Sequence, residues 1–585
     1  MKRWGFGVFL ALALGLVACN SSGPPPTPKY TLAVEFSGSG QGSVSVSPLG
    51  PTKKSSFQLS LSAGTQVTLT ASPDPGSRFL GWQGDCNGTG PCVLTVDADK
   101  QVTANFQAVA SGRLTVYGPS DFVGQNLAIS LPNLGVGEYL AVVPVFASQS
   151  TALDHVTIDL SPQGVQPVSL PTGARSLGTG PGIPSDLSVV EASRNLVEAV
   201  RARGVRPLSG LRPQGFGKCP GPYTPGSTQC SFWVISDRTT SPPTQVPITA
   251  TVQRVSAHAV WFVQDGLTGN DILSEAELDD LVDKFENGIV GAVTDAFGDF
   301  QDFDGNQKIF VVLTPVVGQS GLFGYVYSAD LYPDGTVPGV HSNEGDIVYA
   351  TTPGPAIDIY HWSRTDFLGF VLPGTMAHEL KHLIAVGYRV KQGLPLEESW
   401  VEEPSAEVSR ELAGYGTAYG RILDRAKDAL AAPENFRIVY ASRPTTAAAE
   451  RAMYGFNFLL LWRIHEGAPA GFWKSWVESG QTGVANLEAR TGRSFPDLMV
   501  DWALTLLFDG TGLLPGYEYQ HQDLRDPRWQ KLGYHSLGPV TGQPLRSMAF
   551  YLGKGTGADA TVTLTADLPG EMRVAVVRFS GPLGY

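Results

Sequence analysis

His378, Glu379 and His382 form an HExxH sequence, in which a glutamate directly follows the first of two histidines. On an α-helix, positions i and i+4 lie on one face, so both imidazoles can be directed at one metal ion. A catalytic zinc ion keeps three protein ligands and one water molecule, whose proton a nearby carboxylate can accept. The spacing therefore predicts a hydrolytic zinc site with Glu379 as the general base.

The residues around this motif indicate a buried helix. Met376 and Ala377 precede it and residues 383–386 follow it, and all of these are apolar. Two histidines that point into a protein core are costly unless a metal ion or hydrogen-bond partners satisfy them. The alternative is a pair of hydrogen-bonded core histidines without a metal, but the acidic segment downstream favours the metal site.

A third ligand is expected from a carboxylate on a neighbouring helix, and the candidates after His382 are Glu397, Glu398, Glu402, Glu403 and Glu407. The segment Trp400-Val401-Glu402-Glu403 resembles the W-x-x-E element of the gluzincin metallopeptidases. The resemblance implies that Glu403 completes the zinc site and that Glu407 orients a ligand histidine. Pro404 stands where many relatives have glycine. Because the glutamates at 402 and 403 are adjacent, Glu402 and Glu407 stay open as alternative ligands.

Residues 245–510 also resemble the hyicolysin-type family of bacterial metallopeptidases. The segments that carry this resemblance are 257–263, 297–313, 324–327 and 342–349. The resemblance implies an α+β, zincin-like zinc metallopeptidase domain over residues 246–515, acting on a protein or peptide substrate. A further donor is expected to stabilise the oxyanion, and the sequence leaves four candidates, Tyr388, Tyr415, Tyr454 and His341.

The N-terminus resembles a bacterial lipoprotein signal. Lys2 and Arg3 precede an apolar run that is too short for a membrane span, and small residues lead to Cys19. The prediction is a signal peptide over residues 1–18, lipidation of Cys19 and a proline-rich tether over residues 19–29. This would attach the protein to a membrane of the bacterial cell envelope, on its extracytoplasmic side. A plain secretory signal or a short anchor helix is the alternative.

The other four cysteines form two pairs that are local in sequence, Cys86 with Cys92 and Cys219 with Cys230. We expect two disulfides, which suit an oxidising compartment. Neither pair has the C-x-x-C spacing typical of structural zinc sites, so such a site is disfavoured. Free thiols are the remaining alternative.

The expected fold is multidomain. Residues 30–108 alternate apolar and polar side chains, and the segments 79–86 and 102–106 resemble the internalin-type B-repeat domain, which serves as a spacer or a binding module. Short strands with many prolines predict a β-sandwich-like domain over residues 109–245, for which an inhibitory pro-segment is the alternative to a structural role. Strands after the peptidase domain predict a small, separate C-terminal β module over residues 516–585.

Asp302, Asp304 and Asn306 place side-chain oxygens at alternate positions before the predicted strand 309–313. Positions one, three and five of a calcium-binding loop carry such oxygens, but the closing glutamate is missing because Leu313 occupies its place. The pattern fits either a calcium site or a turn in which aspartate and asparagine make local hydrogen bonds.

The composition narrows the function classes. A formal net charge of −13 argues against binding to nucleic acid, and we expect a monomer. Two functions are consistent with the sequence, a lipid-anchored zinc endopeptidase and a surface adhesion or binding lipoprotein with an inactive peptidase-like domain. Because Glu379 and the expected ligands are all present, the sequence favours the active enzyme.

Overall fold

The computed structural model describes residues 28–48, 50–73, 77–108, 113–168, 187–209, 218–416, 421–440, 447–522, 524–525 and 532–583. The chain forms two compact units, Met1–Val109 and Ala110–Tyr585. The predicted signal peptide, Cys19 and most of the predicted tether lie outside the described residues. Among the residues that are described, no helix is both long and apolar enough to cross a membrane.

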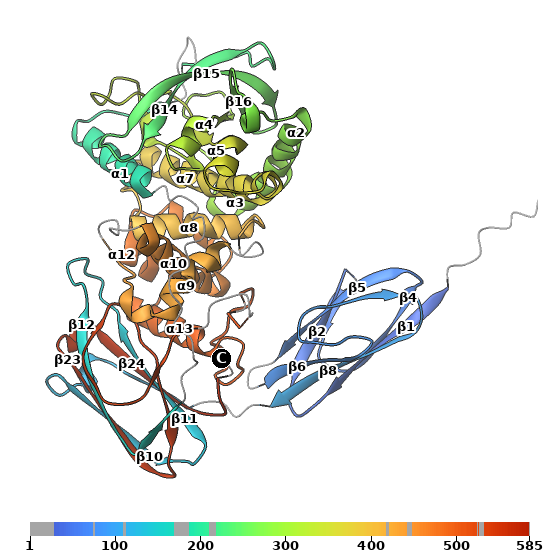
Figure 1. Cartoon of the computed structure of the whole chain (residues 1–585), viewed down its shortest axis with the longest axis vertical. Coiled ribbons are helices and arrows are strands. Elements are labelled where there is room, and N and C mark those ends of the chain that lie inside the picture. Colours follow the sequence, from blue (N-terminus) through green and yellow to red (C-terminus); the bar gives the residue numbers. More distant parts are fainter. Residues whose placement is uncertain are drawn as a thin grey trace, which may run out of the picture. The chain divides into compact units, whose positions relative to one another are not determined.

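The described part of the first unit is all β. Its strands are β1 (Lys29–Ser37), β2 (Gly42–Ser47), β3 (Gly50–Lys53), β4 (Phe57–Ser62), β5 (Thr65–Pro73), β6 (Ser77–Gly84), β7 (Cys92–Val96) and β8 (Lys100–Ala108). They form two four-stranded sheets, in the orders β4-β1-β8-β6 and β3-β2-β5-β7 (Figure 1). Trp82 and Phe106 are buried in the core of this unit. Cys86 and Cys92 form the predicted disulfide, with a Cα–Cα distance of 5.9 Å.

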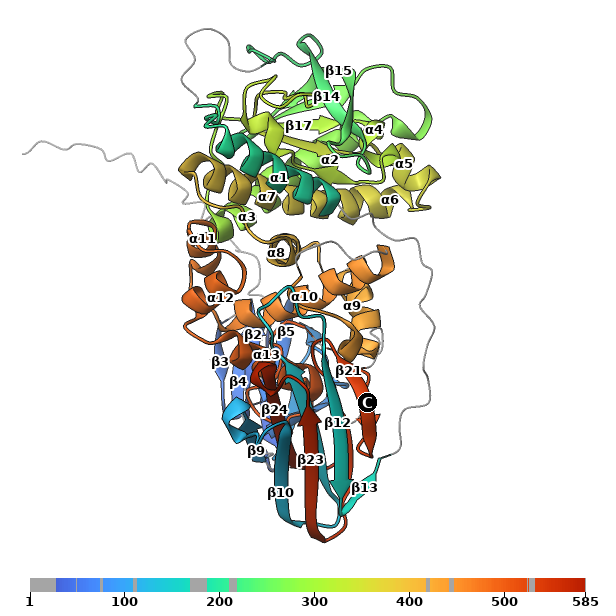
Figure 2. The ribbon, with the colours of Figure 1, turned by 90° about the vertical axis from the view of Figure 1, so that its left-hand side faces the viewer.

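The second unit contains a β-sandwich built from both ends of its sequence (Figure 2). The strands from the first end are β9 (Arg113–Tyr117), β10 (Asn126–Leu134), β11 (Glu138–Phe146), β12 (Val156–Gln163) and β13 (Val165–Pro167); those from the second end are β20 (His535–Ser536), β21 (Val540–Leu545), β22 (Tyr551–Gly555), β23 (Ala558–Ala566) and β24 (Met572–Ser580). One sheet has the order β10-β23-β12-β21, and the other has β13-β22-β11-β24-β9 with β20 paired to β22.

The prediction of a separate C-terminal module over residues 516–585 was therefore wrong. β11 lies antiparallel to β24 from Glu138↔Ser580 to Phe146↔Met572, so the two segments share a continuous backbone ladder. Each segment contributes strands to both sheets but completes neither of them, and their apolar faces form one buried core. The region that contains the HExxH sequence is inserted between the two halves of this sandwich.

The inserted region contains a six-stranded mixed sheet, in the order β14-β15-β16-β17-β19-β18. Its strands are β14 (Gln229–Asp237), β15 (Thr244–Val255), β16 (Ala259–Gln264), β17 (Ile309–Leu313), β18 (Gly324–Tyr325) and β19 (Ile347–Ala350). β16, β17 and β19 are parallel, and the edge strand β18 is antiparallel to β19. Because β14 pairs with β15, the predicted boundary at residue 245 cuts through this sheet and was wrong. The second predicted disulfide, Cys219–Cys230, joins the start of β14 to the preceding loop.

Helices pack on both faces of the mixed sheet (Figures 1 and 2). They include α1 (Leu187–Ala202), α2 (Glu275–Lys284), α3 (Val290–Phe297), α4 (Pro315–Gln319), α5 (Pro353–Asp358), α6 (Arg364–Asp366) and α7 (Leu372–Gln392). α2 begins with a capping box, in which Ser274 and Glu277 satisfy each other's backbone N–H groups. A π-helical turn, Phe285–Ile289, joins α2 to α3.

A helical layer follows α7 and contacts the sandwich through its last helix. Its helices are α8 (Ser399–Leu412), α9 (Arg421–Ala431), α10 (Ala447–Gly467), α11 (Phe472–Val477), α12 (Gly483–Thr491) and α13 (Phe495–Phe508). α7 ends at Gly393, whose φ of 69° is the left-handed conformation that glycine adopts without strain. The buried guanidinium of Arg389 then donates to Pro395 O and Trp476 O. These bonds hold the connection between α7 and α8 in place.

Candidate metal centre

His378 and His382 lie one turn apart on α7, and Glu403 faces them from α8. The Nε2 atoms of the two histidines are 3.1 Å apart. The Glu403 carboxylate lies 3.5 Å from Nε2 of His378 and 3.4 Å from Nε2 of His382. All three side chains are buried, and their ligand atoms form a group that could hold a metal ion. The structure thus brings together the three residues that the sequence suggested as ligands.

These distances fit a zinc ion. Zinc binds histidine nitrogen and carboxylate oxygen at about 2.0–2.2 Å in tetrahedral sites, which places neighbouring ligand atoms about 3.3–3.6 Å apart. The two Nε2 atoms are 3.1 Å apart, Oε2 of Glu403 lies 3.5 Å from His378 and its Oε1 lies 3.4 Å from His382, so each separation is close to that range. One tetrahedral position is left for a fourth group, as in catalytic zinc sites.

Side chains of α8 hold it against α7 and so set the position of Glu403. Ser409 Oγ donates to Ala377 O at 2.9 Å, and Arg410 Nε donates to Gly374 O at 3.1 Å. Pro404, inside α8, has no N–H for the carbonyl of Trp400, one turn earlier. That carbonyl instead accepts a hydrogen bond from Asn457 Nδ2 of α10 at 3.1 Å. The proline therefore costs no hydrogen bond and ties α8 to α10.

Glu402 contacts the outer nitrogen of His382, Nδ1, and does not belong to the group formed by His378, His382 and Glu403. Its Oε1 accepts from His382 Nδ1 at 2.8 Å, and its Oε2 lies 2.7 Å from Lys381 Nζ. Burial would raise the pKa of Glu402, but the charge of Lys381 and the bond from His382 together lower it. An ionised carboxylate at Nδ1 turns the Nε2 lone pair of His382 toward Glu403. Lys381 lies within the HExxH sequence, and a lysine on a buried helix face needs a negative partner. This is the sequence feature that could have indicated the pairing of Lys381 with Glu402.

Glu407 has the corresponding position beside His378. Its Oε1 lies 3.5 Å from His378 Nδ1 and accepts from Arg425 Nη1 at 2.5 Å. Burial would raise the pKa of Glu407, but the charges of Arg410 and Arg425 hold it well below its usual value. This is the orienting position that the resemblance implied for Glu407. The sequence analysis did not single out either arginine.

Glu379 is 2% exposed and lies next to the edge strand β18. A Cβ atom at Gly324 would lie 3.0 Å from Glu379 Cγ and 2.6 Å from Thr375 Cγ2. Only glycine therefore allows the backbone of β18 to approach α7 at this point. β18 is the last strand in the sheet order, so its outer edge has no strand partner among the described residues.

The four residues that the sequence offered as oxyanion donors lie in different parts of the structure. His341 stacks on Trp233 with ring centroids 3.7 Å apart, and its Nδ1 lies 3.8 Å from Asp334. Tyr415 lies beside Gly374, one turn before His378, where a Cβ at the glycine would be 3.1 Å from the tyrosine Cβ. Tyr388 lies on α7 itself and Tyr454 on α10.

Tyr440 is a further tyrosine near the centre that the sequence analysis missed. Burial, followed by the charges of Glu403 and Glu450, raises its pKa. Its hydroxyl therefore stays protonated near neutral pH.

A pocket opens beside His382. Residues of three helices line it, among them Val190 and Ser193 of α1, Ala385 of α7 and Glu402 of α8. Ser193 Oγ also accepts from the N–H of Ser328 at 3.2 Å, which fixes α1 over the segment after β18. α1 thus forms a wall of the pocket beside His382.

Asp302 and Asp304 gather with a different third residue from the one the sequence suggested. Oxygen atoms of Asp302, Asp304 and Asp346 lie within 4.8 Å of one another. The side-chain oxygen of Asn306 instead accepts from Lys308 N, while its amide nitrogen donates to Asp304 Oδ2 at 2.7 Å. The oxygen of Asn306 thus takes part in the local turn, and its role as a calcium ligand stays a prediction.

Comparisons with known proteins identify the first unit. Residues 32–110 match the family described as the divergent InlB B-repeat domain, so the predicted B-repeat module is confirmed. A comparison with curated proteins found no match.

Among solved structures, the chain is similar to a mutant of an M1 zinc metallopeptidase from Deinococcus radiodurans bound to a Tyr-Ser-Ala substrate. The identity is 10% and the TM-score 0.24, over 81% of this chain and 93% of the other. The likeness is weak, and it assigns neither a fold nor an activity to this chain.

Proposed function

We propose that this protein is a zinc endopeptidase that is attached to the bacterial cell envelope through a lipid on Cys19. The observation that carries the activity is the convergence of His378, His382 and Glu403 at separations close to those of a zinc tetrahedron, with Glu379 on the same helix. Glu402 and Glu407 support the proposal, since each places a carboxylate at the outer nitrogen of one histidine.

The substrate we propose is an extended peptide laid along β18. An edge strand has backbone N–H and C=O groups that can pair with an added strand. Gly324 brings the backbone of β18 against Glu379, so a peptide paired along the outer edge of this strand would lie one strand spacing from the part of the sheet that faces the general base. The pocket next to His382, which is lined by Val190 and Ala385, would accept an apolar side chain of the substrate.

When bound, zinc would supply a positive charge that acidifies a water molecule and polarises the peptide carbonyl. In the proposed reaction, Glu379 accepts the proton of the attacking water and passes it to the leaving amine. Burial in a site that excludes bulk water strengthens each of these electrostatic interactions.

The test uses purified residues 21–585, with metal content per chain and casein cleavage as readouts. We expect one zinc per chain in the wild type. Glu379→Gln should keep the zinc and lose activity by a factor of about 10² or more, whereas Glu403→Ala should lose the zinc. The exposed Glu478 provides a matched control, and Glu478→Ala should change neither readout.

A wild-type chain that binds no zinc and cleaves nothing would contradict the proposal. It would instead favour a surface binding lipoprotein with an inactive peptidase-like domain. Zinc retained in Glu403→Ala but lost in Glu402→Ala would overturn the choice between the two neighbouring glutamates.

A further inference from the structure

Three carboxylates form a second acidic cluster away from the histidines. Asp302 and Asp304 lie in the loop before β17, and Asp346 directly precedes β19, so the cluster joins two neighbouring strands of the mixed sheet. The backbone of β19 approaches closely at Gly345, where a Cβ atom would lie 3.0 Å from Asp304 Oδ2. Asp346 occupies the role of the closing acid that the local sequence lacks.

One oxygen of this cluster is buried without a hydrogen bond. Asp346 is 1% exposed, and its Oδ2 accepts from the N–H of Phe303 at 2.5 Å. Its other oxygen, Oδ1, has no hydrogen-bond partner within the part of the chain that the structure describes. A buried carboxylate oxygen left in this state costs free energy that a bound cation would recover.

The burial and the charges of these carboxylates also favour a bound cation. Burial, and then the charges of the neighbouring aspartates, raise the pKa of Asp346 to about 8. Burial and the carboxylate of Asp302 raise the pKa of Asp304 to about 7. Burial and mutual repulsion thus disfavour negative charge at Asp304 and Asp346, and a bound cation would offset both effects.

We propose that Asp302, Asp304 and Asp346 form a calcium site that is independent of the zinc centre. The ligands are oxygen atoms only, which hard cations prefer and which zinc sites with histidine or cysteine do not resemble. Calcium accepts six to eight oxygens at about 2.3–2.6 Å, so ligand oxygens on opposite sides of the ion lie up to about 5 Å apart. The 4.8 Å limit within which the three oxygens lie fits that span.

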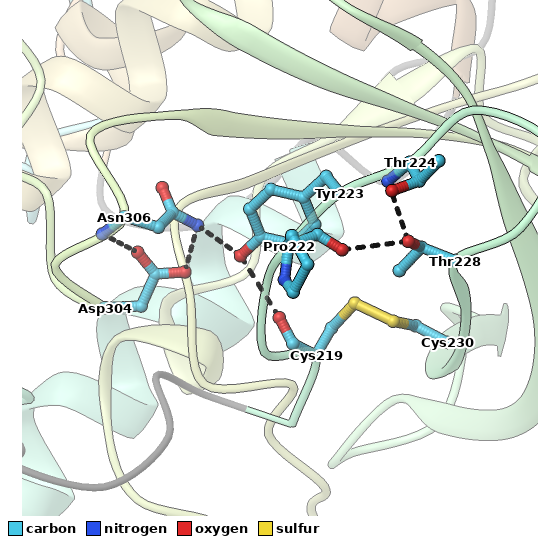
Figure 3. Close-up of a disulfide and its surroundings, with 8 residues drawn as sticks. All are labelled: Cys219, Pro222, Tyr223, Thr224, Thr228, Cys230, Asp304 and Asn306. Carbon is cyan, nitrogen blue, oxygen red and sulfur yellow. Dashed lines mark hydrogen bonds between the residues drawn. A yellow bond between two sulfur atoms is a disulfide. The ribbon is translucent and has the colours of Figure 1, made fainter.

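The surroundings of the site show what the ion would stabilise. Asn306 bridges Asp304 Oδ2 and the Tyr223 hydroxyl, which in turn donates to Cys219 O in the Cys219–Cys230 disulfide loop (Figure 3). The cluster is thereby joined to the loop in front of β14.

The loop that carries Asp302 and Asp304 also packs on α7. A Cβ atom at Gly387 would lie 3.3 Å from the Phe303 ring, and Lys391 Nζ donates to Gln301 O at 2.8 Å. Calcium bound between Asp302 and Asp346 would thus hold this loop against the C-terminal half of the helix that carries both histidines.

The test measures Ca²⁺ binding to residues 21–585 by calorimetric titration after chelation, together with the melting temperature with and without Ca²⁺. We expect one Ca²⁺ per chain and a higher melting temperature in its presence. Asp302→Asn should weaken Ca²⁺ binding tenfold or more. Asparagine tolerates the positive φ of 48° at position 302 and keeps a side-chain oxygen for the N–H of Gln307, so the variant should retain the fold. Asp346→Asn should weaken Ca²⁺ binding by the same factor.

The exposed Asp299 in the same loop is the matched control, and Asp299→Asn should bind Ca²⁺ like the wild type. Glu403→Ala should also bind Ca²⁺ normally, which separates this site from the zinc centre. No Ca²⁺ bound by the wild type, or unchanged binding in Asp302→Asn and Asp346→Asn, would overturn the proposal. Equal binding of Mg²⁺ would overturn the assignment to calcium.

Discussion

Replacing Glu402 by glutamine tests how buried charge supports the candidate zinc centre. Glu402 lies 2.7 Å from Lys381 Nζ and accepts from His382 Nδ1 at 2.8 Å. Lys381 is 0% exposed. Glutamine keeps the shape of the side chain and an oxygen for His382, but it leaves the lysine without its counter-charge. The variant therefore separates the effect of charge from that of packing.

The expected loss of stability follows from the burial of this pair. Removing one partner of a buried ion pair costs about 3–5 kcal/mol. Burial already lowers the pKa of Lys381, so the lysine can lose its proton in the variant. We therefore expect Glu402→Gln to lower the free energy of unfolding by about 3 kcal/mol, at the lower end of that range. Loss of the orienting charge at His382 should also weaken zinc binding about 10–100-fold.

The assay combines urea unfolding with a zinc titration against a chelator that reports metal by its absorbance. The double variant Lys381→Met/Glu402→Gln removes both charges and should recover about 1–3 kcal/mol relative to the sum of the single variants. Its zinc affinity should stay low, because the carboxylate at His382 is still missing. Free energies that add to within about 0.5 kcal/mol would refute the coupling.

Two further predictions concern the edge strand and the response to acid. Gly324→Ala should reduce peptidase activity about tenfold or more at unchanged zinc content, because its Cβ would displace β18 from Thr375 and Glu379; full activity would show that β18 can move aside freely. Arg364 donates to both oxygens of Glu277, at 2.6 and 2.9 Å, and lowers the pKa of that carboxyl to about 2. The resulting stability is present above the unfolded pKa of about 4.3 and is lost as the pH falls toward about 2. Arg364→Met should therefore lower the free energy of unfolding by about 1–2 kcal/mol near neutral pH, after a discount for partial exposure, and by almost nothing at about pH 2; an equal loss at both pH values would mean that Arg364 acts through packing alone.

The candidate metal centre shows which ligands the local sequence can predict and which depend on tertiary packing. His378 and His382 belong to one helix, so their spacing alone predicts that they share a face. Glu402 and Glu403 are adjacent on α8 and point about 100° apart around the helix axis. Which of them faces α7 depends on the rotation of α8, and contacts such as Asn457 with Trp400 set that rotation. The resemblance to the gluzincins favoured Glu403, and the structure places Glu403 with the histidines and Glu402 behind one of them.

The sequence by itself determined the local features of this protein, namely the strands, the capped helix α2, the disulfide pairs and the two histidines on one face of α7. These depend on side-chain periodicity and on residues that are close along the chain. Only the tertiary structure decided which distant segments meet. It paired β11 with β24 across more than 400 residues and brought Asp346 to Asp304. Alternating side chains predict a strand, but its partner depends on which apolar faces can be buried together, and the local sequence does not contain that information.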